Sequence, residues 1–250
     1  MILRRLAEAL RRQDWLTVAV EFLIVVAGIF VGLQVSDWNE QRKAREEELV
    51  YLERLLQDLD ESIADTSEDR DFQVEHARQG ALVLRALKEC RLRPDERDEF
   101  ATGLYRLGKI ASVSLARATI DELRSTGKFT LLRNTALRTQ ISNLLQEHQR
   151  SLDFIGDLQN RLGPQINYVD RHVAILVTGP IGGGASITGD QLEMDFQALC
   201  NDPLFYNAVA ASINYTWDVT AGLDRWLGDM AAVRGAIAIE LGQLTDGESP

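Results

Sequence analysis

The chain has 250 residues, two cysteines and a net charge of −11. Residues 1–36 hold four basic and three acidic side chains, so residues 37–250 carry a net charge of −12. Such an acidic surface repels phosphate backbones, and no basic patch interleaved with aromatic residues offsets it, which argues against a nucleic-acid partner. The length is sufficient to bury a sizeable core without disulfides.

Residues 1–14 contain the stretch "ILRRLAEALRRQ", in which apolar residues line one side of a helix and arginines line the other. The pattern predicts a short basic amphipathic helix in the headgroup layer of a membrane, and a solvated stub that only supplies charge is the alternative. Four arginines precede the next segment and three basic residues follow it, so the positive-inside rule favours a cytoplasmic N-terminus.

Residues 15–36 form an apolar run in which Glu21 and Gln34 are the only strongly polar side chains. The length meets the roughly 20 residues that a helix needs to cross the hydrocarbon core of a bilayer. A cleaved signal peptide is the alternative, but its apolar core would be shorter and would end at an AxA-like site, which does not follow here. The run predicts a single transmembrane helix that places residues 37–245 outside the cytoplasm.

Residues 37–63 contain no proline or glycine and are rich in strong helix formers, so the membrane helix is expected to continue into them as a stalk. Apolar residues repeat there at alternating spacings of three and four, as Leu49, Leu52, Leu56, Leu59 and Ile63. This heptad seam predicts coiled-coil-like packing against another helix, either in the same chain or in a second copy.

The boundaries of three further helices follow from capping residues. Pro94 and the acidic residues after it start one helix, and a short helix closes near Gly127. Asn134 caps a long helix that meets a kink at Gly163 and Pro164. The inward side of that long helix is expected to carry Leu137, Ile141, Leu144, His148, Leu152, Ile155 and Leu162.

Residues 178–190, "TGPIGGGASITGD", predict a flexible loop. Asp202 and Pro203 then predict the cap and first residue of a last long helix, and residues 246–250 form a tail. The inward side of this helix is expected to carry Tyr215, Val219, Leu223, Trp226, Met230, Val233, Ile237 and Leu241. No alternating pattern is long enough for a convincing β-strand. The predicted fold is all-α: one N-terminal transmembrane helix continues into a long stalk helix, and an extracytoplasmic antiparallel helical bundle follows.

The two cysteines, Cys90 and Cys200, are compatible with two arrangements. One is a single disulfide in an oxidising compartment, and the other is a pair of separate buried thiols. The sequence does not distinguish between them.

Three stretches resemble a bacterial domain-of-unknown-function family of N-terminally anchored, single-span membrane proteins. "EFLIVVAGIFVGLQVSDWNEQRKAREEE" resembles its membrane signature, in which a glutamate leads into LVxxGIxxxxQxxxWNExRK. "IDELRSTGKFTLLRNTALRTQI" and "DFQALCNDPLFYNAV" resemble its EELxSSGxLxLIxNxxLR and DFxxLLxDPEFRN elements.

The signature residues that carry over are Glu21, Gly28, Gln34, Trp38, Asn39 and Glu40. The chain departs from the family in having Val20 where a glycine often precedes the glutamate. The resemblance implies a single-pass protein of the bacterial inner membrane with a helical periplasmic domain, and it implies no reaction.

A small-residue face is predicted on the membrane helix. At about 100° per residue, Gly28, Gly32 and Asn39 all lie within about 20° of Glu21 around the helix. Gly28 and Gly32 form a GxxxG motif, which lets two membrane helices approach closely and would bury Glu21 against protein instead of lipid. We therefore expect self-association through this face.

Three other membrane residues are set apart by position. Trp15 and Trp38 are about 35 Å apart along the helix and fit the two aromatic belts of a bilayer, so they are expected to anchor the helix at the interfaces. Gln34 points away from the Glu21 face and is expected to bond backbone or headgroups. Glu21 itself has two interpretations. It is either a structural side chain, which hydrogen-bonds to a partner helix or snorkels to the near headgroups, or a carboxylate that handles protons or ions.

No motif for catalysis or metal binding is present. His76, His148 and His172 are isolated, HExxH, CxxC and GxSxG are absent, and the glycine-rich loop lacks the GK[ST] of a phosphate loop. His148 lies on an apolar stripe and is expected to be a packed core residue. The sequence predicts no enzyme, no metal site and no cofactor.

The predicted function is that of a non-enzymatic, membrane-anchored periplasmic interaction or scaffold module. Its expected partners are membrane lipid, a second copy of the chain and another membrane or periplasmic protein. The alternative function is that of a subunit of a proton- or ion-coupled membrane complex in which Glu21 is the working carboxylate.

Overall fold

A computed structural model describes residues 15–176 and 186–246, without the side chains of residues 15–19, Glu21 and Asp246. Within these ranges the chain forms six α-helices, three short 3-10 helices and one two-stranded sheet. The chain divides into two compact units, Met1–Tyr51 and Leu52–Pro250. The predicted all-α fold class is confirmed. The predicted cytoplasmic segment 1–14 lies outside the described residues.

The longest helix, α2 (Trp15–Glu89), belongs to both units. It runs without interruption through residues 37–63, where the helix was predicted to continue because proline and glycine are absent. It also extends beyond the predicted stalk as far as Glu89. One hydrophobic run and one heptad pattern are therefore parts of a single helix.

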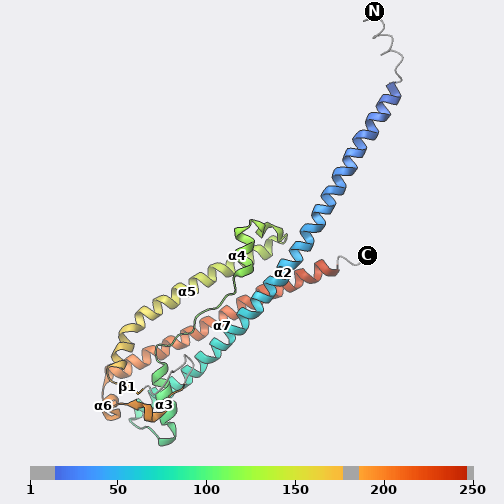
Figure 1. Ribbon diagram of the computed structural model, residues 1–250. Helices are drawn as coiled ribbons and strands as arrows, with labels where there is room; N and C mark the ends of the chain where they lie inside the picture. Colours follow the sequence, from blue (N-terminus) through green and yellow to red (C-terminus); the bar gives the residue numbers. More distant parts are fainter. Residues whose placement is uncertain (1–14, 177–185, 247–250) are drawn as a thin grey trace, which may run out of the picture. The chain divides into compact units, whose positions relative to one another are not determined.

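In the second unit, helices α5 (Thr135–Asp170) and α7 (Pro203–Asp246) lie side by side and antiparallel (Figure 1). At one end Asn134 Nδ2 donates to Glu240 Oε2 at 2.6 Å, and at the other end the Tyr168 hydroxyl donates to Asp202 Oδ2 at 2.8 Å. These two bonds tie both ends of α5 to α7. Helix α5 continues through Pro164 as far as Asp170.

Helix α2 is also antiparallel to α7. Arg70 Nε donates to Asp224 Oδ1 at 2.9 Å, and Arg234 pairs with Asp60, so residues later in α2 meet residues earlier in α7. The part of α2 in this unit and helix α5 are therefore parallel to each other. A connection must carry the chain back from the end of α2 to the start of α5.

That connection consists of η1 (Pro94–Glu96), α3 (Arg97–Arg106), an extended stretch, α4 (Ala118–Ser125) and η2 (Lys128–Leu131). The extended stretch, residues 107–117, runs along the long helices of this unit (Figure 1). It has no strand partner, so its backbone groups need hydrogen bonds from side chains.

Side chains of the long helices supply those bonds. Ser212 Oγ accepts from the Gly108 amide at 3.2 Å, Ser62 Oγ accepts from the Ala116 amide at 2.8 Å, and Trp226 Nε1 donates to a carbonyl of the stretch at 3.1 Å. Ser62 and Ser212 are each 1% exposed. The extended stretch therefore explains why these two serines are buried in the long helices.

The predicted helix ends at Gly127, Asn134 and Asp202 are confirmed, whereas Pro94 begins the 3-10 helix η1 and α3 begins three residues later. Asn134 Oδ1 accepts from the Leu137 amide at 3.1 Å, and Asp202 Oδ1 accepts from the Leu204 amide at 2.9 Å. Gly127 follows α4 with φ of 73°, the left-handed conformation that glycine adopts without strain.

Between α5 and α7 the chain forms β1 (Ala174–Ile175), η3 (Gly189–Gln191), β2 (Leu192–Glu193) and α6 (Phe196–Cys200). The two strands are antiparallel, with Ala174 opposite Glu193. Most of the predicted flexible loop, residues 178–185, lies outside the described residues. Its last part is held against α3, because the backbone amide of Ile187 donates to Thr102 Oγ1 at 3.1 Å and its carbonyl accepts from the same hydroxyl at 2.9 Å.

The heptad seam is covered within one chain at two of its five positions, whereas Leu49, Leu56 and Ile63 are half-buried. Leu52 and Leu59 are 0% and 3% exposed, so no second copy is needed to cover them. The predicted inward stripes of α5 and α7 are also largely buried, through Leu137, Ile141, Leu144, His148, Ile155, Leu162, Val219, Leu223, Trp226, Met230, Val233 and Ile237.

Close packing of α3 on α2 predicts an effect for Gly103→Ala. A Cβ at Gly103 would lie 2.8 Å from Val83 Cγ2 and 3.0 Å from the Gln79 carbonyl oxygen, and the backbone oxygen cannot rotate away. We expect a loss of roughly 1–3 kcal/mol in the free energy of unfolding, measured by urea denaturation. The control is Gly156→Ala in α5, where a Cβ meets nothing within 4 Å, so a gain of about 0.5–1 kcal/mol is expected. Equal effects of the two variants would contradict the packing argument.

Candidate functional site

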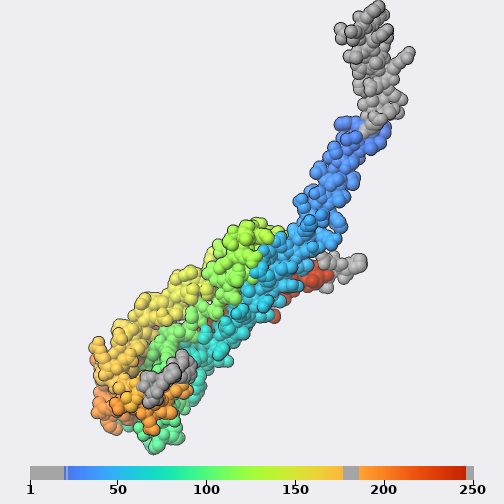
Figure 2. Space-filling model, viewed as in Figure 1, coloured from blue at the N-terminus to red at the C-terminus, as the bar shows by residue number. Residues whose placement is uncertain are grey.

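One stretch of α2 exposes apolar side chains all around the helix. Apart from the half-buried Val26, the large apolar residues between Phe22 and Val35 are 58–66% exposed, and this stretch stands uncovered in Figure 2. Within the described residues, this is one helix long and apolar enough to cross a membrane. The exposed residues are Phe22, Leu23, Ile24, Val25, Ile29, Phe30, Val31, Leu33 and Val35.

The predicted interaction face lies in this stretch. A Cβ at Gly28 or Gly32 would meet no atom within 4 Å, so neither glycine is needed for a contact inside the chain. Asn39 is exposed as well. Glu21 lies in α2, but its side chain is outside the described residues, so its place on this face stays a prediction.

The predicted interface residues are in the same helix. Trp38 is 64% exposed and Gln34 is exposed, which leaves both side chains open to surrounding solvent or lipid. The side chain of Trp15, at the start of α2, is outside the described residues.

The three histidines lie apart. His172 is exposed, whereas His76 and His148 are buried. The His148 ring packs against Trp226 with ring centroids 5.6 Å apart, which confirms that it is a packed core residue. In the part of the chain that the structure describes, no group of three or more His, Cys, Asp or Glu side chains could hold a metal ion.

His76 is a buried titratable group at the level of the extended stretch. Burial lowers its pKa to about 4, and the nearby positive charge of Arg106 contributes in the same direction, while the backbone of Lys109 opposes the change. The ring is therefore neutral at pH 7. It fills space in the core and does not carry charge there.

The lowered pKa of His76 predicts that the folded chain loses stability in mild acid. Between about pH 6.5 and pH 4, His76 binds a proton in the unfolded chain but stays neutral in the folded chain. The free energy of unfolding therefore falls as the pH drops. We expect a loss of about 2 kcal/mol between pH 7 and pH 5, and about 3 kcal/mol by pH 4. Urea denaturation at each pH measures it.

His76→Gln should flatten this pH dependence, and the surface variant His172→Gln is its control. If His76→Gln retains the full slope between pH 7 and pH 5, another group causes the acid sensitivity.

Cys90 and Cys200 form a disulfide, with Cα atoms 5.3 Å apart and 110 residues between them in sequence. The bond joins the residue that follows α2 to the last residue of α6, just before α7 begins. Of the two arrangements compatible with the sequence, the structure shows the bridged one.

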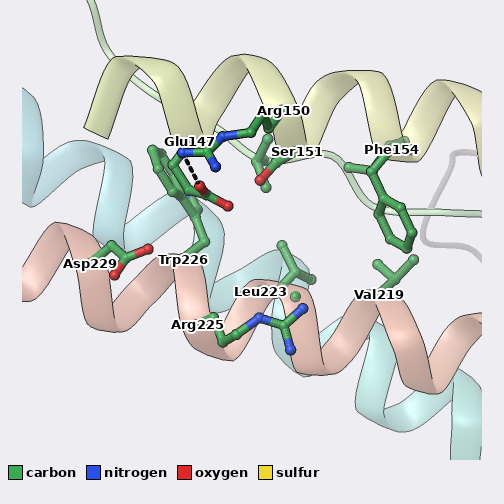
Figure 3. A pocket seen from close by; sticks show the side chains of 12 residues that line it. Glu147, Arg150, Ser151, Phe154, Val219, Leu223, Arg225, Trp226 and Asp229 are labelled. Atoms are coloured by element: carbon green, nitrogen blue, oxygen red, sulfur yellow. Dashed lines mark ion pairs between the residues drawn. The ribbon is translucent and has the colours of Figure 1, made fainter. Parts of the chain in front are cut away.

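A pocket of about 190 Å³ lies between α5 and α7 (Figure 3). Its floor is formed by Ile155, Leu223 and Trp226, with Val113 of the extended stretch. Charged residues surround the floor, and one pair of them, Glu147 and Arg150, forms an ion pair at 2.9 Å that is drawn in Figure 3. The remaining lining residues are Ser151, Phe154, Val219, Gly222, Arg225 and Asp229.

The sequence predicted the apolar stripes of both helices but not the pocket. Helical periodicity assigns Ile155, Leu223 and Trp226 to an inward face, and it contains no information on whether the facing side chains fill the space between them. Gly222 lies one turn before Trp226 and has no side chain, so it is the residue in the sequence that indicates open space beside this apolar stripe.

No protein-family model, no curated protein and no solved structure matches this chain. The family resemblance of the membrane signature therefore stays a prediction.

Proposed function

We propose that the chain is a non-enzymatic, single-span inner-membrane protein whose helical domain lies in the periplasm and serves as an interaction or scaffold module. The observation that carries the proposal is the stretch of α2 between Phe22 and Val35, in which nine large apolar side chains are exposed. Each Leu, Ile, Phe or Val near the centre of a membrane helix favours insertion by about 0.3–0.6 kcal/mol. Lipid is the environment in which such a surface is stable.

The disulfide supports the orientation. Disulfides form and persist in oxidising compartments, and the Cys90–Cys200 bond lies in the second unit. The basic residues that precede the helix support a cytoplasmic N-terminus by the positive-inside rule.

Self-association through the membrane helix is the second part of the proposal. Gly28 and Gly32 are open, and close approach of a second helix there would bury small surfaces against each other. A cysteine placed at Gly32 should crosslink two copies of the chain in native membranes, whereas one placed at Leu52, which is buried within its own chain, should not. The reverse pattern would contradict the proposed face.

Two arginines in the membrane stretch test the anchor. Val25→Arg with Ile29→Arg should cost about 5–7 kcal/mol of insertion free energy and release the chain from carbonate-washed membranes. The matched control is Trp217→Arg with Ile239→Arg, which replaces two exposed apolar residues of α7 and should leave the chain in the membrane fraction. Release by both pairs, or by neither, would contradict the assignment.

The orientation is tested with a single added thiol. Ser125→Cys lies at the exposed end of α4, so a membrane-impermeant maleimide should label it in intact spheroplasts. Labelling that requires lysis would place this domain in the cytoplasm.

A further inference from the structure

We propose that the pocket between α5 and α7 binds a small molecule that combines one aromatic ring with a carboxylate. The proposal goes beyond the membrane anchor and the interaction module, because it concerns a ligand site inside the second unit. It rests on the shape of the pocket, its size and the position of one guanidinium group.

The pocket exists because a glycine stands where a side chain would fill it. Outside the backbone of its own helix, a Cβ at Gly222 would meet only an Arg225 guanidinium nitrogen, 4.0 Å away, so this flexible side chain alone borders the space in front of Gly222. Below it, Leu223 and Trp226 are each 1% exposed and form a rigid apolar floor.

The size of the pocket fits one ring. An apolar cavity of roughly 150 Å³ is sufficient to bind benzene, and this pocket measures about 190 Å³. Phe154 stands at its edge opposite Val219 and is 46% exposed, which offers an aromatic edge to a bound ring (Figure 3).

The space in front of Gly222, where the ring of a ligand would bind, has a positively charged side chain beside it. Glu147 and Arg150 neutralise each other in their ion pair, while Arg225 and Asp229 have no ion pair with any of the described residues. The Arg225 guanidinium lies over Gly222, whereas Asp229 is seven residues further along α7, about 10 Å away along the axis. A guanidinium binds carboxylates through paired hydrogen bonds and stacks on aromatic faces.

A small molecule fits this pocket better than a partner helix does. A helix laid along α5 and α7 would take Glu147, Arg150 and Asp229 out of water together, and the side chains of the ion pair are 41% and 69% exposed. Desolvation of such a pair costs as much as the pair returns. A ligand of one ring leaves these groups hydrated.

The test uses the full-length chain in lipid nanodiscs, titrated with phenylpropionate by isothermal calorimetry, with empty nanodiscs to subtract partitioning into lipid. We expect saturable binding to the unchanged chain. Binding to Gly222→Leu should be at least tenfold weaker, because the leucine side chain enters the space where the ring would bind. Gly228 is an exposed glycine of the same helix outside the pocket, so Gly228→Leu should bind as the unchanged chain does. Arg225→Gln should bind phenylpropionate at least fivefold more weakly, and phenylpropanol should bind the unchanged chain at least fivefold more weakly than the acid.

Circular dichroism of each variant confirms that it is folded before its binding is compared. Absence of saturable binding, equal binding by Gly222→Leu and Gly228→Leu, or tighter binding of phenylpropylamine than of the acid would overturn the proposal. A tripeptide ending in phenylalanine that bound more tightly than phenylpropionate would assign the pocket to a protein carboxyl terminus and would also overturn it.

Discussion

Reduction of the Cys90–Cys200 disulfide is expected to lower the free energy of unfolding by about 4–5 kcal/mol. The bond closes a loop of 110 residues in the unfolded chain, and the entropy removed by such a crosslink grows with the length of the loop. Thermal and urea unfolding of the full-length chain, followed by circular dichroism with and without a reductant, measures the difference.

The cysteine variants provide the control for this experiment. Cys90→Ala, Cys200→Ala and the double variant each break the same bond, so all three should match the reduced chain and their effects should not add. Equal stability of the oxidised and reduced chains would contradict the expected loss of entropy in the unfolded chain.

Trp226→Ala is expected to destabilise the chain by about 3–5 kcal/mol. The side chain is 1% exposed, its ring packs on His148, and its Nε1 donates to the Ser114 carbonyl at 3.1 Å. The substitution therefore removes core volume and one of the bonds that hold the extended stretch. Urea denaturation of the variant measures the loss.

Two further variants separate these contributions. Trp226→Phe keeps most of the apolar volume but removes the bond to Ser114, so a smaller loss of about 1–2 kcal/mol is expected. Trp217→Ala, in the same helix but at a side chain that is 53% exposed, should change stability by less than about 0.5 kcal/mol. A similar loss from Trp217→Ala would mean that the effect is not specific to the core position.

Local chemistry determined the helices and their ends. Asn134 and Asp202 have side chains that can accept from the first amides of a helix, and Gly127 tolerates a positive φ, so each marks a boundary without knowledge of the rest of the chain. The apolar run of residues 15–36 and the absence of helix breakers in residues 37–63 likewise predicted the long helix α2.

Only the tertiary structure decided which distant residues meet. The pairing of Cys90 with Cys200 depends on the chain returning through α6 to the end of α2. The burial of Leu52 and Leu59 within one chain was one of two alternatives for the heptad seam. Periodicity predicts that a face of the helix is covered, but it does not identify the segment that covers it.

The candidate ligand site shows the same division. The sequence by itself determined that Leu223 and Trp226 face inward, since an apolar spacing of three to four residues marks one side of a helix. Whether that side is filled depends on which α5 residues stand opposite, on the placement of Val113 and on the open space at Gly222. Those are contacts between segments far apart in the chain, and helical periodicity, which is a local property, does not contain them.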